Sequence, residues 1–133
     1  MYIIALRFMS LNLEVVPYIK VRHLVDKAFN KNFRFVMYGA LLSNLALVII
    51  TFKTPTTLLF LTSLIAFLAL IIDALITVKG NLPINSIINS WTTENYPANW
   101  ADYRKDWLRY FTYRQIVNIT GFIFLLIGTV FQN

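Results

Sequence analysis

Three stretches of the chain are apolar almost without interruption, and polar residues are concentrated in the segments around them. Residues 35–52 carry no charge, residues 56–78 carry only Asp73, and residues 115–131 are again uncharged. At about 1.5 Å per helical residue, the first stretch covers about 27 Å, close to the roughly 30 Å hydrocarbon core of a bilayer. The pattern therefore predicts three membrane-spanning helices. The link at residues 53–55 is so short that the first two must form an antiparallel hairpin.

The N-terminal segment, residues 1–19, has a less regular pattern. Arg7 and Glu14 interrupt its apolar run, and Pro17 ends it. If the segment spans the membrane, Arg7, Leu11 and Glu14 share a face that looks inward. The alternative is an amphipathic helix that lies in the membrane interface. Both alternatives stay open at this point.

Composition indicates that lipid is the solvent of these helices. Hydrophobic residues make up 58% of the chain and charged residues only 14%, and the mean hydropathy is +0.62. A soluble domain of 133 residues could not bury that much apolar surface. We therefore predict an all-α, integral membrane, up-down four-helix bundle that forms a single domain over residues 1–133. The chain has no cysteine, which excludes disulfides, thiolate catalysis and Cys-ligated metals.

The formal charge of +6 reflects basic residues placed beside the apolar spans. Because they do not interleave with exposed aromatic residues, we expect membrane-topology charges and no nucleic acid partner. The positive-inside rule places the two basic connections in the cytoplasm and both termini outside. The connection at residues 53–55 carries only Lys53. The basic connections carry Lys20, Arg22, Lys27, Lys31 and Arg34, and Lys79, Arg104, Lys105 and Arg109.

A polar, tryptophan-rich insert, residues 79–114, separates the last two apolar stretches. Gly80 is a natural helix stop, so we expect the preceding helix to end there. Pro97 suits a helix start, and the last helix is expected to begin near Ala98 and run to the end of the third apolar stretch. The insert contains every tryptophan of the chain, Trp91, Trp100 and Trp107.

Within this insert, Asn81 and Asn85 flank Pro83. The two amides fit either a capping turn or an anchor for the polar oxygen of a ligand, and both alternatives stay open. His23 is the only histidine. Because it lies among basic residues in a predicted connection, a solvated or headgroup-facing role is favoured over catalysis, and we expect no metal site.

One face of the predicted last helix carries a continuous stripe at alternating steps of three and four residues. Its first half is cationic and aromatic, and its second half contains glycines that would let a neighbouring membrane helix approach closely. The stripe consists of Arg104, Trp107, Phe111, Arg114, Asn118, Gly121, Leu125 and Gly128.

Asp73 is a carboxylate inside an apolar span, where it costs about 2.5–3.5 kcal/mol at mid-membrane and less near the edge. Arg114 lies at a similar depth on the neighbouring span, so we expect a charge-assisted pair. The pair fits either a structural pin between helices or an acid or base whose proton affinity is tuned by burial.

The Asn-x-Pro-x-Asn segment that closes the third span, followed by Trp-x-x-Tyr and an arginine in the fourth, resembles the small membrane proteins grouped as anthrone-oxygenase-like. The resemblance covers residues 73–131 and, in the N-terminal half, only the helix pattern. One feature departs from it: Phe111 and Thr112 stand where many members carry Asn-His, so a family-type histidine base is absent. The matching residues are Asn81, Pro83, Asn85, Trp107, Arg109, Tyr110 and Arg114.

The resemblance implies an oxygenase of a planar phenolic or quinone-type substrate, with molecular oxygen as co-substrate and no other cofactor. Such a reaction needs a base and donors that hold a phenolate-like anion. Asp73 is the implied base and Arg114 the cationic donor beside it. The implied substrate-binding residues are Asn81, Asn85, Trp107, Tyr110 and Arg104.

Other functions stay open beside the oxygenase. A non-catalytic bundle that binds a lipid or quinone would use the same polar residues to recognise a headgroup. A small transporter or complex subunit is least supported, because one intramembrane carboxylate makes a poor pathway. The expected partners are membrane lipid and a small hydrophobic aromatic ligand, and self-association is left open.

Overall fold

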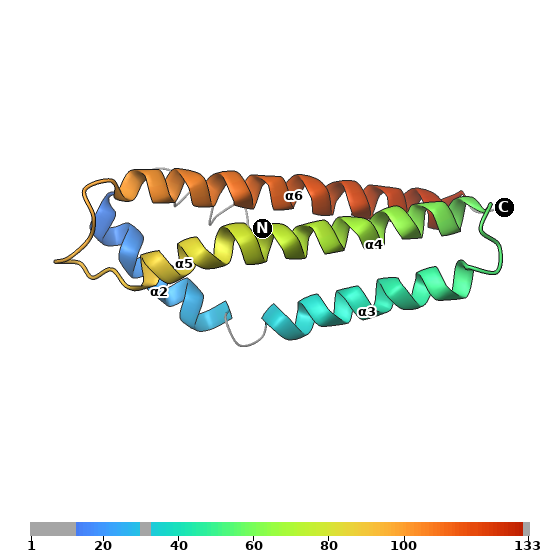
Figure 1. The fold of residues 1–133 in the computed structure, drawn as a ribbon, viewed down its shortest axis with the longest axis horizontal. Helices are drawn as coiled ribbons and strands as arrows, with labels where there is room; N and C mark the ends of the chain where they lie inside the picture. The colour runs from blue at the N-terminus through green and yellow to red at the C-terminus, as the bar shows by residue number, and fades with distance from the viewer. Residues whose placement is uncertain (1–12, 30–32, 132–133) are drawn as a thin grey trace.

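The computed structural model describes residues 13–29 and 33–131, and every regular element within them is helical. The elements are α2 (Val15–Phe29), α3 (Phe33–Thr51), α4 (Leu58–Ile76), the π-helical turn η1 (Thr77–Asn81), α5 (Leu82–Asn89) and α6 (Trp100–Val130). Because α4, η1 and α5 follow one another without a break, they form one long rod (Figure 1). The predicted all-α class is confirmed.

The rod and α6 run antiparallel side by side, and α4 lies between α6 and α3 (Figure 1). Glycines permit the close packing of α6 on α4. A Cβ added at Gly121 would lie 2.8 Å from the Cβ of Ala69, and one at Gly128 would overlap the hydroxyl of Thr62. The predicted stripe on the last helix is confirmed, because all its members are buried or half-buried.

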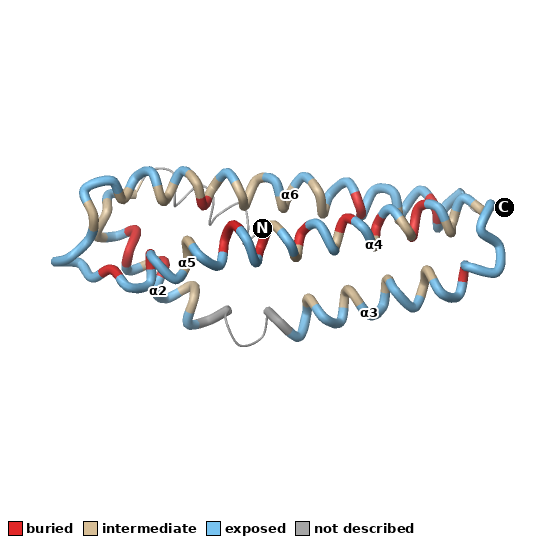
Figure 2. Tube along the Cα trace, viewed as in Figure 1, coloured by how far each residue is buried: buried red, intermediate tan, exposed pale blue. Residues whose placement is uncertain are grey.

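The predicted hairpin of α3 and α4 is also present. The Thr57 hydroxyl caps α4 by accepting a hydrogen bond from the Phe60 amide at 3.3 Å. The hydroxyls of Thr51 and Ser63 lie 3.4 Å apart and link the two helices. Of the α3 side chains that the structure describes, Thr51 alone is buried, and the others from residue 35 onward are exposed or half-buried (Figure 2).

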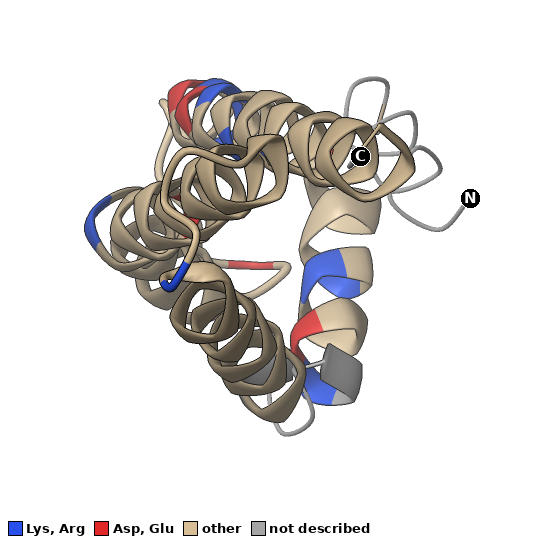
Figure 3. Cartoon of the chain, turned by 90° about the vertical axis from the view of Figure 1, so that its right-hand side faces the viewer, with Lys and Arg blue, Asp and Glu red and all other residues tan. Residues whose placement is uncertain are grey.

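Two of these helices are long and apolar enough to cross a membrane. They are the rod Leu58–Asn89 and α6, whereas the apolar part of α3, Phe35–Thr51, is shorter. Only 28% of the most apolar segment of the rod and 11% of that of α6 are buried. The core helix of a soluble protein would be mostly buried, so neither helix resembles one. Viewed along the bundle, the apolar helices are almost free of charged residues (Figure 3). The described part of the chain therefore has two candidate spans, fewer than the sequence pattern suggested.

The segment at α2 differs from its prediction. Residues 1–12, which hold most of the predicted first span, lie outside the described residues. Residues 20–34 were expected to form a connection, but the chain is helical over Val15–Phe29. Pro17 lies in the first turn of this helix, where its missing N–H needs no partner. His23 therefore sits on a helix, with its side chain exposed, and α2 runs obliquely across the end of the bundle (Figure 1).

The prediction that Gly80 stops the third helix is wrong, because the helix continues to Asn89. Gly80 has a different role: a Cβ there would lie 2.5 Å from Cδ1 of Tyr110 on α6. The position thus needs glycine for a close approach and not for a left-handed turn. The widened turn η1 precedes Pro83, which donates no N–H and whose ring crowds the carbonyl four residues earlier.

The turn η1 changes the direction in which the residues after it point. A π-turn inserts one extra residue, which turns the following helix back by about 100°. Asp73 and Asn85 would differ by about 120° on an uninterrupted α-helix, but differ by only about 20° with the insertion. Both side chains can therefore face α6, and each bonds a residue there, Arg114 and Trp107.

Candidate functional site

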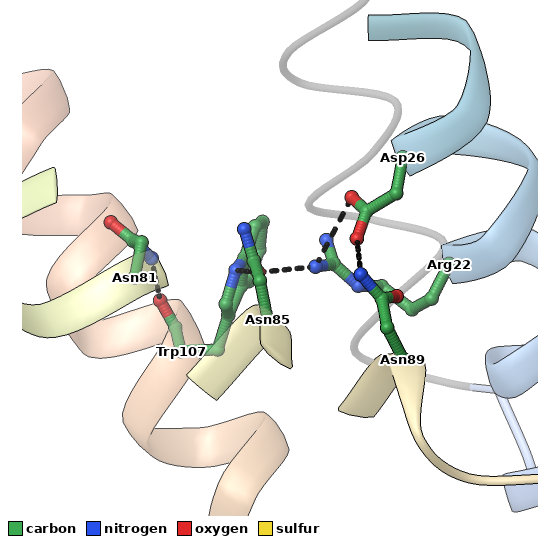
Figure 4. Close-up of polar contacts among 6 residues, drawn as sticks. All are labelled: Arg22, Asp26, Asn81, Asn85, Asn89 and Trp107. Atoms are coloured by element: carbon green, nitrogen blue, oxygen red, sulfur yellow. Dashed lines mark hydrogen bonds and ion pairs between the residues drawn. The ribbon is translucent and has the colours of Figure 1, made fainter. Parts of the chain in front are cut away.

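Three asparagines at steps of four residues, Asn81, Asn85 and Asn89, hold the centre of a polar network (Figure 4). The Asn85 Oδ1 accepts two hydrogen bonds: one from Arg22 Nη2 at 2.5 Å, the other from the indole Nε1 of Trp107 at 2.8 Å. One amide oxygen therefore joins α2, α5 and α6 at a single point.

A second polar link fastens α2 to α5. Asn89 Nδ2 donates to Asp26 Oδ2 at 2.5 Å, and Arg22 forms an ion pair with Asp26 at 3.6 Å. Arg22 and Asp26 are one helical turn apart, as are Asn85 and Asn89. The two helices thus meet through matched i, i+4 pairs. We call these four residues the α2 clamp.

Side chains of the protein itself cover both faces of the Trp107 indole. The Phe111 ring stacks on the indole with centroids 4.9 Å apart and an interplanar angle of 14°. The guanidinium carbon of Arg22 lies 4.5 Å from the indole centroid, a cation–π contact that must use the other face. The geometry therefore makes Trp107 an anchor for α2, with both faces of its indole covered.

Arg104 lies at a separate contact. Its Nη1 donates to the Leu13 carbonyl at 2.8 Å, and its guanidinium lies 4.7 Å from the Trp100 centroid and 6.0 Å from that of Tyr18. This arginine therefore binds the start of α2 to the start of α6. The contact borders a small apolar core made of Tyr18, Ile19, Ile88 and Trp91.

Asp73 and Arg114 form the predicted pair. Arg114 Nε donates to Asp73 Oδ1 at 2.6 Å, and the side chains of Arg114 and Asp73 are 16% and 9% exposed, respectively. Arg114 also takes part in a further interaction. The pair joins the last turn of α4 to α6, at the polar end of both apolar stretches. Its geometry fits both the structural and the chemical role that the sequence left open.

Asn81 has a buried acceptor without a donor. Its Nδ2 donates to the backbone carbonyl of Trp107 at 3.3 Å, which fixes the orientation of the amide because a carbonyl only accepts. The residue is 2% exposed, and no described residue donates to its Oδ1. Uncompensated burial of such a group costs about 1–3 kcal/mol. The capping turn is not what forms here, since Asn81 ends η1 and Asn85 lies within α5.

The structure brings together some of the predicted site residues and separates others. Asn81, Asn85 and Trp107 share one network, Tyr110 packs on neighbouring Gly80, and the pair of Asp73 and Arg114 follows on the same face of the rod. Arg104 belongs to the α2 contact, and His23 is exposed. Sequence analysis missed Tyr18, Arg22, Asp26 and Asn89. The spacing of four residues between Tyr18, Arg22 and Asp26 would have been a usable signal if residues 15–29 had been predicted as a helix.

No group of three or more His, Cys, Asp or Glu that could hold a metal ion occurs in the described part of the chain. Comparison of the chain with protein-family models, with curated proteins and with solved structures finds no match. The resemblance to anthrone-oxygenase-like proteins thus rests on the residues quoted for it.

Proposed function

We propose that the chain is an integral membrane protein that binds a small planar phenol or quinol beside η1, between the rod and α6. The observation that carries the proposal is the buried Oδ1 of Asn81, an acceptor that no described residue satisfies. A phenolic hydroxyl is a donor on an otherwise apolar molecule. It would satisfy Asn81 while its ring stays among apolar side chains.

The membrane setting is supported by what surrounds the apolar helices. Their large side chains remain exposed along α3, α4 and α6, including Phe35, Leu68, Ile72, Phe122 and Val130. A protein in water rarely exposes so much contiguous apolar surface. Lipid would cover it without a partner chain and would also deliver an apolar ligand directly to the bundle.

The proposed orientation puts the polar end of the bundle in the cytoplasm, with the α3–α4 turn and the end of α6 outside. Lys20, Lys27, Lys79, Lys105 and Arg109 have exposed side chains at or near that end, whereas Lys53 alone marks the α3–α4 turn at the other. Basic residues favour the cytoplasmic side of a membrane protein. The Asn81 site then lies just inside the cytoplasmic membrane face.

A matched pair of probes tests the hydrogen bond to Asn81. 1-Naphthol carries the donor, and 1-methoxynaphthalene has the same rings without it. The full-length protein in lipid nanodiscs should bind 1-naphthol about two- to tenfold more tightly, the ratio that one neutral hydrogen bond provides. Binding is followed by quenching of the probe fluorescence.

The variant Asn81→Leu should bind both probes equally. Asn44→Leu is the control, because it removes an asparagine from α3 that bonds only within its own helix. If the wild type does not discriminate between the probes, or if Asn81→Leu still does, the site is not at Asn81. A melting curve for each variant shows that it remains folded.

A second candidate function, a cofactor-independent oxygenase, is favoured by the buried pair of Asp73 and Arg114 two turns from Asn81. In that reaction Asp73 would take the acidic carbon-bound proton of an anthrone, and Arg114 would stabilise the resulting phenolate. Molecular oxygen would then oxidise the anion, with quinone and water as products. Oxygen uptake with an anthrone distinguishes the candidates. For an enzyme, Asp73→Asn abolishes uptake but retains probe binding, whereas a binding protein shows no uptake in the wild type.

A further inference from the structure

Two buried hydrogen-bond donors on α2 have no acceptor. The side chains of Tyr18 and Arg22 are one helical turn apart on the face that packs inward, and the residues are 1% and 4% exposed. No described residue accepts from the Tyr18 hydroxyl or from Arg22 Nε, although Arg22 Nη2 is engaged by the α2 clamp. Each of these buried donors needs an acceptor.

The charges around these donors favour an anion. The positive charges of Arg22 and Arg104 both lie close enough to affect the Tyr18 phenol electrostatically. The guanidinium of Arg104 lies 6.0 Å from the centre of the Tyr18 ring. Asp26 is the acidic side chain that faces this contact, and it is already bonded to Arg22 and Asn89. Among the described residues, two cations therefore meet one carboxylate. The burial of Tyr18 raises the pKa of its phenol, so the hydroxyl remains a donor at neutral pH.

We propose that the contact of α2 with the start of α6 is a phosphate site, in which Tyr18 Oη and Arg22 Nε donate to the oxygen of a phosphate group. Guanidinium and phenol donors suit phosphate oxygens, and charge-assisted bonds of this kind are about twice as strong as neutral ones. Trp100 and Arg104 border the site and are residues typical of headgroup depth. An anionic phospholipid is therefore the favoured source of the phosphate, and free inorganic phosphate is the other.

This site is distinct from the one proposed for a phenol. Asn81 offers an acceptor and lies on the rod, whereas Tyr18 and Arg22 offer donors and lie on α2. Asn85 and Trp107 lie between Asn81 and Arg22 (Figure 4). Loss of either site thus leaves the other measurable.

Entry of the phosphate requires a local opening of α2, because both donor atoms are enclosed. The α2 clamp and the Arg104 bond to the Leu13 carbonyl are the polar links that hold α2 in place. A lipid that enters in this way should also leave slowly. It should therefore survive purification, and this makes it detectable without knowledge of its identity.

The test uses the full-length protein in nanodiscs that contain equal amounts of phosphatidylglycerol and diglucosyldiacylglycerol, an uncharged lipid without phosphate, followed by native mass spectrometry of the released protein. We expect the wild type to retain phosphatidylglycerol about tenfold over the glycolipid. Tyr18→Phe removes the hydroxyl alone, and Arg22→Lys removes Nε while it keeps the charge; both should lose the preference. Lys20→Gln, which removes an exposed charge from the same helix, should keep it.

Equal retention of the two lipids by the wild type overturns the proposal. So does unchanged retention in Tyr18→Phe, the variant that is isosteric and decides the matter if Arg22→Lys fails to fold. An equal loss in Lys20→Gln overturns it too, because the effect would then be one of net charge. Addition of inorganic phosphate identifies the source within a positive result: displacement of the lipid assigns the site to a soluble phosphate, and retention assigns it to the headgroup.

Discussion

Removal of either member of the pair formed by Asp73 and Arg114 should cost far more stability than removal of an exposed pair. The Nε–Oδ1 distance is 2.6 Å and the side chains are only 9% and 16% exposed. Loss of one partner leaves the other charged in a setting of low polarity, and for a buried pair that costs about 3–5 kcal/mol. We expect the stability loss of Asp73→Asn to lie near the lower end of this range, since Arg114 takes part in a further interaction that it keeps. Arg114→Gln also loses that interaction, so its stability loss should lie near the upper end.

The assay is the free energy of unfolding in mixed micelles of mild and denaturing detergent, and the double variant completes a thermodynamic cycle. Its loss should fall short of the sum of the single losses by about 1–3 kcal/mol. The ion pair of Arg109 with Asp106 is a matched control on the same helix: its atoms are 3.2 Å apart, but its side chains are 56% and 49% exposed. Its removal should cost about 0–1 kcal/mol. Strictly additive losses, or a control as costly as the buried pair, would refute the reasoning.

Three further predictions concern packing, pH and topology. Gly128→Ala places a methyl group on the Thr62 hydroxyl and should destabilise the protein by about 1–3 kcal/mol. Gly39→Ala, with open space around it, should be neutral or stabilise the protein by up to about 1 kcal/mol. Equal effects of the two substitutions on thermal unfolding in detergent would count against close α4–α6 packing. Burial raises the pKa of Tyr18 above its usual 10.0, so its contribution to stability is complete below about pH 10 and is lost as the pH rises through the folded-state pKa. The wild type should therefore lose stability more steeply than Tyr18→Phe above about pH 10 in alkaline unfolding curves, and parallel curves would contradict this. A single cysteine at Thr54, in a chain that has no other, should react with an impermeant thiol reagent from outside intact cells, and reaction only from the cytoplasm would invert the proposed topology.

The parts of the fold that could be predicted are those in which a helical period and a membrane-length apolar run agree. The hairpin of α3 and α4 and the end of α6 follow from such runs, and the start of α6 follows from Pro97. The contact of Asp73 with Arg114 was predictable for a related reason, since a charge in an apolar span needs a partner at a similar depth. The glycines of the α6 stripe were likewise found from periodicity alone.

The α2 clamp could not be predicted, because its residues depend on a helix that the local pattern argues against. Pro17 and the basic residues around His23 suggest a connection, whereas the segment is a helix that packs on Ile88 and Trp91. The prediction that Gly80 ends the third helix was wrong for a similar reason. A glycine that admits the Tyr110 ring cannot be told from a glycine that ends a helix until the neighbouring helix is in place.

The turn η1 also determines which changes in chain length this protein can tolerate. Deletion of one residue within Thr77–Asn81 would let the turn close into an ordinary α-helix, and Asn85, then eleven positions after Asp73, would still differ from it by only about 20°. Asn85 would therefore keep its direction toward Trp107, and Asn89 toward Asp26. Closure of the turn without a deletion would instead turn both asparagines away by about 100°. The rod thus carries one spare residue in η1, so its polar face should tolerate the loss of that residue but not the loss of the widened turn at full length.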